Sequence, residues 1–298
     1  MFIFEMLKTI LLGIVEGITE WLPVSSTGHM ILLDEFITLD VTPSFKELYL
    51  VVIQLGAIAA VAVVFWQRLN PFSKSKTAEE KRKTWNIIGK TIVGVIPAAI
   101  IGFVFDDILD KYLYNYITVA ITLILYGILF IAVEKANAKR MYRINTVDDM
   151  TYADALAIGG FQILSLIPGT SRSGSTILGG MAMGISRTAS AEFSFFMAIP
   201  VMLGASLLKV AKFTLKYALA LMGKSAESAS VYIPTGEGFK YSLLLILGMA
   251  VAYLISLWAI KFLMDFVKRN SFSVFGVYRI ILGAIVGVYF IIKSFALY

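Results

Sequence analysis

The chain is 298 residues long; 58% of its residues are hydrophobic and only 15% are charged, and its mean hydropathy is +0.82. These values exclude an ordinary soluble globular protein, and the absence of cysteine excludes disulfides and thiolate metal sites. The net charge of +6 is spread over the connecting segments and forms no block. Orientation of the chain in a membrane explains this distribution better than nucleic-acid binding does. We therefore predict one polytopic all-α membrane domain over residues 1–298.

Six stretches are long and apolar enough to cross a bilayer, which needs about 20 residues. They lie at about 47–66, 86–106, 114–134, 188–210, 241–263 and 275–294. Two further apolar stretches are each split by a polar break, with arms at 2–22 and 29–37 and at 152–167 and 177–185. Arms this short suit re-entrant hairpins that enter and leave the membrane on one side. The predicted fold is six transmembrane helices plus two re-entrant helical hairpins.

The order of these elements predicts an inverted-topology repeat. A hairpin plus three spans crosses the membrane an odd number of times, so the second copy (about 146–298) must be inverted relative to the first (about 1–145). The copies align at an offset of 145 residues, which pairs Ser25 with Thr170 and Ser26 with Ser171. Inverted repeats with broken helices place a ligand near the midplane, and two helix N-termini there favour an anion. We therefore expect the two breaks to meet, with Ser26 within about one diphosphate length of Arg172.

Charge in the connecting loops predicts the orientation. One set of loops carries twice as many Lys and Arg residues as the other. The rich set is 67–85, 135–151 and 264–274, and the poor set is 38–46, 107–113 and 211–240. The positive-inside rule places the rich set in the cytoplasm and both termini outside.

The first break, at residues 16–29, carries two carboxylates, four hydroxyls and the only histidine of the chain. Glu16 and Glu20 are four residues apart, so a helix places them on one face. Pro23 ends that helix. Three hydroxyl residues then serve as predicted N-caps of a short second helix beginning near His29: Ser25, Ser26 and Thr27. Ionisable groups at membrane depth cost about 2.5–3.5 kcal/mol each, so the break predicts a functional site.

The second break, at residues 168–176, combines glycines and hydroxyls with one arginine. Glycines let backbone N–H groups turn toward a ligand, and the guanidinium of Arg172 suits phosphate oxygens. The spacing nearly matches a nucleotide P-loop, but Ser175 replaces the required lysine and no strand precedes it, so we reject that interpretation. The predicted substrate-binding residues are Gly169, Thr170, Ser171, Ser173 and Thr176, together with Ser25 and Thr27 of the first break.

Together the two breaks resemble the undecaprenyl-diphosphatase family, also known for bacitracin resistance. The resemblance lies in Glu-Gly-x-Thr-Glu-x-Leu-Pro-x-Ser-Ser-x-Gly-His at 16–29 and Pro-Gly-x-Ser-Arg-Ser-x-x-Thr at 168–176, and it extends over essentially the whole chain. It implies an integral enzyme of the bacterial cell membrane that removes the terminal phosphate of undecaprenyl diphosphate and regenerates the lipid carrier for cell-wall synthesis. It also implies a divalent cation, Mg²⁺ or Ca²⁺, and an active site open to the outer face. The expected partners are the lipid substrate and the bilayer, and a homodimer is left open.

The residue chemistry is consistent with that class of enzyme. Glu16 and Glu20 would repel a diphosphate, and a Mg²⁺ or Ca²⁺ ion between the carboxylates and the phosphate oxygens removes the conflict. Arg172 and the helix N-termini supply positive potential. Three attacking groups stay open: the Ser26 oxygen, a His29 nitrogen, and a water activated by His29. We favour Ser26 with His29 as its base, because residues three apart on a helix can share a hydrogen bond.

A secondary transporter or lipid flippase is the alternative, because inverted repeats around a midplane anion site are a transporter's architecture. Paired acids beside a hydroxyl, an imidazole and an arginine favour chemistry instead. Two other features have simpler interpretations. Arg279 lies one turn inside the last span, where snorkelling to the cytoplasmic surface is expected. The four tryptophans predict interface belts: Trp21, Trp66, Trp85 and Trp258.

Overall fold

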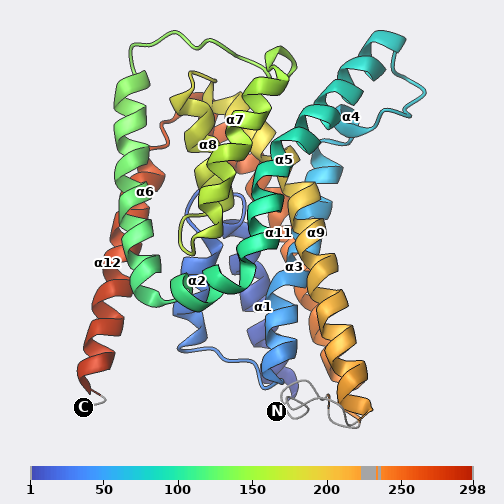
Figure 1. Ribbon diagram of the computed structural model, residues 1–298, viewed down its shortest axis with the longest axis vertical. Helices are drawn as coiled ribbons and strands as arrows, with labels where there is room; N and C mark the ends of the chain where they lie inside the picture. The colour runs from blue at the N-terminus through green and yellow to red at the C-terminus, as the bar shows by residue number, and fades with distance from the viewer. Residues whose placement is uncertain (1, 223–232, 234–235, 297–298) are drawn as a thin grey trace.

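The computed structural model describes residues 2–222, 233 and 236–296, and this part of the chain is helical apart from turns and one isolated β-bridge between Ile144 and Ile185 (Figure 1). The elements are α1 (Phe2–Thr19), α2 (Ser26–Asp34), α3 (Pro43–Val64), α4 (Trp66–Leu69), α5 (Ala78–Leu113), α6 (Tyr116–Asn137), η1 (Val147–Asp149), α7 (Tyr152–Ile163), η2 (Leu164–Leu166), α8 (Arg172–Ala182), α9 (Arg187–Leu221), α11 (Gly238–Arg269) and α12 (Ser273–Ala296). The predicted all-α class is confirmed.

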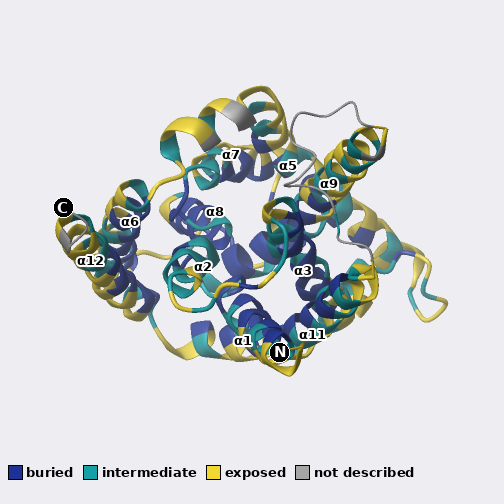
Figure 2. Cartoon of the chain, turned by 90° about the horizontal axis from the view of Figure 1, so that it is seen from below, coloured by how far each residue is buried: buried dark blue, intermediate teal, exposed yellow. Residues whose placement is uncertain are grey.

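Six helices of the described chain are long and apolar enough to cross a membrane: α3, α5, α6, α9, α11 and α12. Each overlaps one of the six predicted spans. Between 28% and 50% of each apolar window is buried, so every span leaves much of its surface facing outward. Seen from below, buried residues fill the centre of the molecule and exposed residues line its outside (Figure 2). Exposed apolar side chains on such helices are what contact with lipid requires.

Helix α9 is longer than predicted. It continues to Leu221, whereas hydropathy placed the end of the span near residue 210. The extra turns are mostly Ala, Leu and Lys, without an internal proline or glycine, and these three residue types favour helix whether or not lipid surrounds them. The remainder of the predicted 211–240 loop, including Lys224, lies largely outside the described residues.

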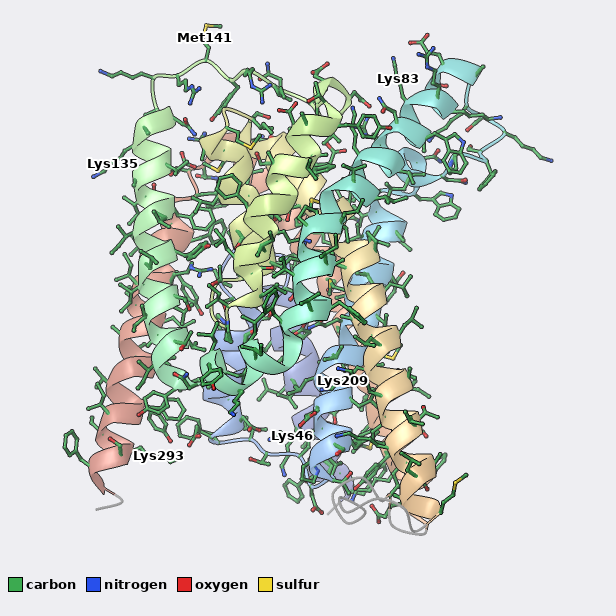
Figure 3. All side chains as sticks on the ribbon, in the orientation of Figure 1. Lys46, Lys83, Lys135, Met141, Lys209 and Lys293 are labelled. Carbon is green, nitrogen blue, oxygen red and sulfur yellow. The ribbon has the colours of Figure 1, made fainter. Side chains whose placement is uncertain are left out.

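The positions of the loops can be compared with the orientation that their Lys and Arg content predicted. Figure 1 places both termini at one end. Lys83 and Lys135, from two of the basic loops, lie near the opposite end, whereas Lys46 and Lys209 lie near the end that holds the termini (Figure 3). Loops 67–85 and 135–151 therefore share an end, as predicted.

The two broken segments occupy the centre of the molecule. Helices α2 and α8 lie inside a ring formed by the longer helices (Figure 2). Every residue of α8 from Ser173 to Met181 is buried. A helix that begins with hydroxyl residues is thus enclosed in the protein interior, where polar groups must find partners or a ligand.

Candidate active site

The first break is a tight turn between α1 and α2. The N–H of Glu20 still donates to the Glu16 carbonyl at 3.0 Å, so the helical path continues one turn past Thr19. The Ser25 hydroxyl then accepts from the Gly28 N–H at 3.2 Å and caps α2. The helix therefore begins at Ser26 rather than near His29. Ser25 alone is the N-cap, and the expectation that Ser26 and Thr27 also cap this helix was wrong.

The second break ends in the same way. The Ser171 hydroxyl accepts from the Gly174 N–H at 3.0 Å and caps α8. Ser25 and Ser171 have φ values of 72° and 73°, and they are the only non-glycine residues with positive φ in the described part of the chain. This conformation costs roughly 1–3 kcal/mol per residue and is concentrated at functional sites.

This match corrects the predicted alignment. Ser25 corresponds to Ser171, not to Thr170. Val24 alone separates Pro23 from Ser25, whereas two residues separate Pro168 from Ser171. The second break therefore contains one extra residue, which a constant offset could not reveal.

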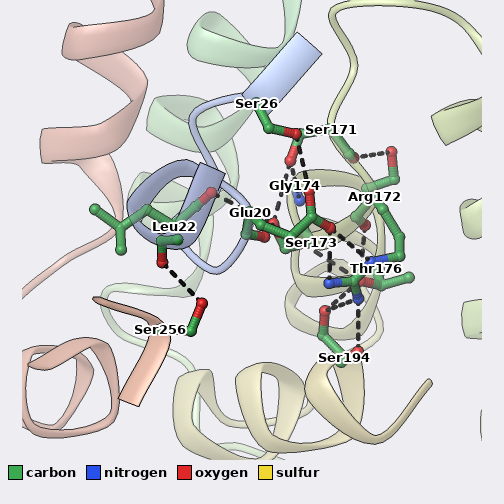
Figure 4. Close-up of polar contacts among 12 residues, drawn as sticks. Glu20, Leu22, Ser26, Ser171, Arg172, Ser173, Gly174, Thr176, Ser194 and Ser256 are labelled. Atoms are coloured by element: carbon green, nitrogen blue, oxygen red, sulfur yellow. Dashed lines mark hydrogen bonds and ion pairs between the residues drawn. The ribbon is translucent and has the colours of Figure 1, made fainter. Parts of the chain in front are cut away.

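The two breaks meet at one carboxylate (Figure 4). The Ser26 hydroxyl donates to Oε2 of Glu20 at 2.8 Å. The Arg172 guanidinium donates to Oε1 of the same residue at 3.3 and 3.4 Å. The side chains of Glu20 and Arg172 are each 9% exposed. Ser26 and Arg172 thus contact the two oxygens of a single group, and the predicted meeting of the breaks is confirmed.

Further hydrogen bonds fix this arrangement. The Ser173 hydroxyl donates to the Glu20 carbonyl at 3.1 Å. Arg172 also donates to the Ser194 carbonyl at 2.8 Å, and the Thr176 hydroxyl donates to the Ser194 hydroxyl at 2.7 Å. The hydroxyls of Ser173 and Thr176, predicted to bind substrate, therefore bond protein atoms here. The sequence analysis missed Ser194, which lies within α9. A serine in an apolar span commonly makes hydrogen bonds between helices, so its presence alone does not indicate a site.

The remaining predicted binding residues surround the same turn. Thr170 is completely buried and its hydroxyl has no partner among the described residues. Gly169 has φ of 85°, and a Cβ there would lie 2.2 Å from the Thr122 hydroxyl, so only glycine fits. Thr27, in the first turn of α2, is half-buried.

The His29 ring makes its hydrogen bonds to residues other than Ser26. Its Nδ1 lies 2.7 Å from the Ser25 carbonyl, which can only accept, so Nδ1 carries the proton. Its Nε2 lies 2.6 Å from the hydroxyl of Tyr278 on α12, and the two rings are stacked. The predicted hydrogen bond between Ser26 and His29 is therefore replaced by two others, from Ser26 to Glu20 and between His29 and Tyr278. Tyr278, which lies far away in the sequence, was missed.

Glu16 keeps an unused oxygen. The residue is 2% exposed, and its Oε1 has no hydrogen-bond partner within the described chain. Gln162, which occupies the same position relative to Ser171 as Glu16 does to Ser25, is likewise buried with both polar atoms unpaired. Among the described residues, no group of three or more His, Cys, Asp or Glu side chains could hold a metal alone. An unpaired buried carboxylate oxygen beside Glu20 suits a cation that also takes ligands from a substrate.

Two residues lie where the sequence did not place them. Arg279 is completely buried and donates to the carbonyls of Pro23 at 3.0 Å and Gly169 at 2.8 Å, so it does not reach a membrane surface. Trp21 is also fully buried, with the Arg172 guanidinium 5.7 Å from its ring centroid, so it is no interface residue. Both predictions relied on the position of the residue along its span. The structure shows that each side chain instead contacts residues of the two breaks.

Comparisons with known proteins agree with one another. The family model described as bacitracin resistance protein BacA matches residues 9–285. The chain is 52% identical to the undecaprenyl-diphosphatase of Enterococcus faecalis over 278 residues, which cover 93% of this chain and 95% of the relative. It is 51% identical to the undecaprenyl-diphosphatase of Acetivibrio thermocellus, over 96% of this chain and 98% of the relative. The enzyme of the same name from Streptococcus mutans is 48% identical over 98% of this chain and 99% of the relative.

Proposed function

The chain belongs to the bacitracin resistance protein BacA family, and from that premise we propose that it hydrolyses undecaprenyl diphosphate to undecaprenyl phosphate and inorganic phosphate. It is a multi-pass membrane protein, and this activity would recycle the lipid carrier for peptidoglycan and other cell-wall polymers and confer resistance to bacitracin. The observation that carries the proposal is the meeting of the Ser26 hydroxyl, the Glu20 carboxylate and the Arg172 guanidinium at two capped helix N-termini.

The geometry supports Ser26 as the attacking group. Its proton already points to the Glu20 carboxylate at 2.8 Å, so Glu20 can accept that proton as the oxygen attacks the terminal phosphorus. The phosphoanhydride bond then breaks and undecaprenyl phosphate leaves. Water hydrolyses the resulting phosphoserine and releases inorganic phosphate. Attack by His29 requires Nε2 to leave Tyr278, and attack by a water activated by His29 requires the same.

The charges of the site favour a divalent cation. Glu20 is paired with Arg172, and Glu16 adds a second carboxylate, so a bound diphosphate would bring more negative charge than Arg279 alone can compensate. Glu16 and Glu20 are the residues that would hold Mg²⁺ or Ca²⁺, together with phosphate oxygens. The bound ion would neutralise the phosphate oxygens and orient them.

Helix packing supports the inverted repeat and its two re-entrant hairpins. Helix α1 crosses α11 where Gly13 meets the Gly248 carbonyl, and α7 crosses α5 where Gly159 meets the Gly94 carbonyl. Each hairpin thus packs on a span of the other half of the chain. The α1–α2 segment lies in the half of the molecule that holds the termini and α7–α8 in the opposite half (Figure 1). We infer that the hairpins enter the membrane from opposite sides of one domain.

The charge of the loops supports a bacterial cell-membrane protein with its basic loops in the cytoplasm and its termini outside. In that orientation, the α1–α2 hairpin enters from the outer face, which is consistent with an active site that receives lipid there. A homodimer stays a prediction from the resemblance.

Phosphate release from the purified, detergent-solubilised protein tests the proposal directly. We expect undecaprenyl diphosphate to yield inorganic phosphate, and Ser26→Ala to abolish the release. A transporter or flippase would release none under these conditions but would move lipid in sealed vesicles. That outcome would replace the proposed function with the alternative.

A further inference from the structure

Arg279 is a buried arginine without a carboxylate partner among the described residues. It is 0% exposed, and its guanidinium donates to three carbonyl oxygens: Pro23 at 3.0 Å, Gly169 at 2.8 Å and Thr170 at 3.0 Å. Pro23 belongs to the first break, and Gly169 and Thr170 belong to the second break. One side chain from the last helix therefore joins the backbones of both halves of the site.

Two partly buried arginines, by contrast, each have an acid. Arg187 makes a two-pronged ion pair with Glu134, at 2.5 to 3.1 Å, and Arg172 pairs with Glu20. Arg279 instead has three carbonyl dipoles and the ring of Tyr126, whose centroid is 5.5 Å from the guanidinium carbon. The carbonyl oxygens accept from Nη1 and Nη2 without cancelling the charge, and Nε has no partner among the described residues. A positive charge therefore persists beneath both helix N-termini, where it favours an anion.

The contacts also set the direction of the peptides. In a trans peptide the C=O and N–H groups point in opposite directions. The Thr170 carbonyl faces Arg279, so the N–H of Ser171, in the same peptide plane, faces away from Arg279. The two bonds to Gly169 and Thr170 thus hold the two successive peptides that lead into Ser171, one of the two non-glycine residues with positive φ in the described part of the chain.

We propose that Arg279 is a positioning residue for the reaction, which locks the nucleophile-bearing break against the anion-binding break and supplies a permanent positive charge beneath them. This inference rests on the proposed function and adds a residue outside both sequence motifs. Arginine is required rather than lysine, because a planar guanidinium reaches carbonyls of both breaks at once and an ammonium lacks that fork.

The test compares Arg279→Lys and Arg279→Gln with the wild-type protein in detergent, with kcat, KM and melting temperature measured on each. Misplacement by about 1 Å can cost about 100-fold in rate, so we expect kcat of both variants to fall by roughly 10- to 100-fold. KM should stay within about 3-fold for the lysine variant, which keeps the charge, and rise for the glutamine variant, which loses it. Arg187→Lys and Arg187→Gln are the matched controls, since they disturb a partly buried arginine whose hydrogen bonds go to Glu134 and to neither break, and the folded protein should keep its kcat and KM.

Each outcome decides the matter. Variants of Arg279 that melt earlier but show wild-type kcat and KM per folded molecule would limit the residue to a structural role and overturn the inference. If neither variant is recovered folded, Tyr126→Leu takes its place, because it removes the ring that packs on the guanidinium. Tyr126→Phe is its control, because it keeps the ring and removes only the hydroxyl that bonds Ser175 of the second break. A kcat of Tyr126→Leu below that of Tyr126→Phe supports the inference, and equal kcat values refute it. Absence of phosphate release by the wild-type protein would refute the proposed function instead.

Discussion

Replacing Arg172 by lysine should remove most of the activity although the charge is kept. The guanidinium makes two bonds to Oε1 of Glu20, at 3.3 and 3.4 Å, and one to the Ser194 carbonyl at 2.8 Å. A lysine ammonium can occupy one of these positions at a time and cannot form the fork. Two bonds of a charged group are then lost, at about 1.5 kcal/mol each or more. Roughly 3 kcal/mol corresponds to about a 100-fold loss in kcat/KM.

The assay is phosphate release from undecaprenyl diphosphate in detergent, with melting temperature as the measure of folding. Arg187→Lys is the control, because it breaks a comparable fork to Glu134 away from both breaks. We expect the control to keep its kcat/KM. Near-normal turnover by Arg172→Lys would show that the shape of the guanidinium is unimportant and would refute the reasoning from its geometry.

Three further substitutions test the cation site and the second break. Glu20→Gln should lose activity that a higher concentration of Mg²⁺ or Ca²⁺ partly restores, and Glu16→Gln should show the same effect less severely. If the activity of both variants depends on the metal concentration as the wild-type activity does, these acids do not bind the cation. Gly169→Ala should lower stability by about 3 kcal/mol, seen as a lower melting temperature, because the residue has positive φ and its Cβ would overlap the Thr122 hydroxyl. Gly160→Ala, where a Cβ meets nothing within 4 Å, should be neutral or stabilising, and equal melting temperatures for the two variants would contradict this account.

Hydropathy and polar breaks predicted much of this fold because both are local properties. A span of about 20 apolar residues is visible in any window that contains it, and all six were found. The break at 16–29 was equally visible, since acids are costly in such surroundings. The end of α9 was missed because hydropathy marks where an apolar stretch ends, and this helix continues beyond that point to Leu221.

The partners within the site could not be predicted from spacing. Ser26 and His29 are three residues apart on one helix, yet each bonds a group outside that helix: Glu20 for Ser26 and Tyr278 for His29. Position along the span likewise suggested that Arg279 reaches the surface. Its contacts come from two breaks more than 100 residues away in the chain, and no local pattern encodes them.

Trapping of the phosphorylated protein tests the central claim most directly. The terminal phosphate of undecaprenyl diphosphate carries the label, and the reaction is quenched in acid and, separately, in alkali. Because the Ser26 hydroxyl already donates to Glu20, we predict acid-stable label on Ser26 that Ser26→Ala abolishes. Label found only after the alkaline quench and located on His29, or no covalent label after either quench, would contradict attack by Ser26.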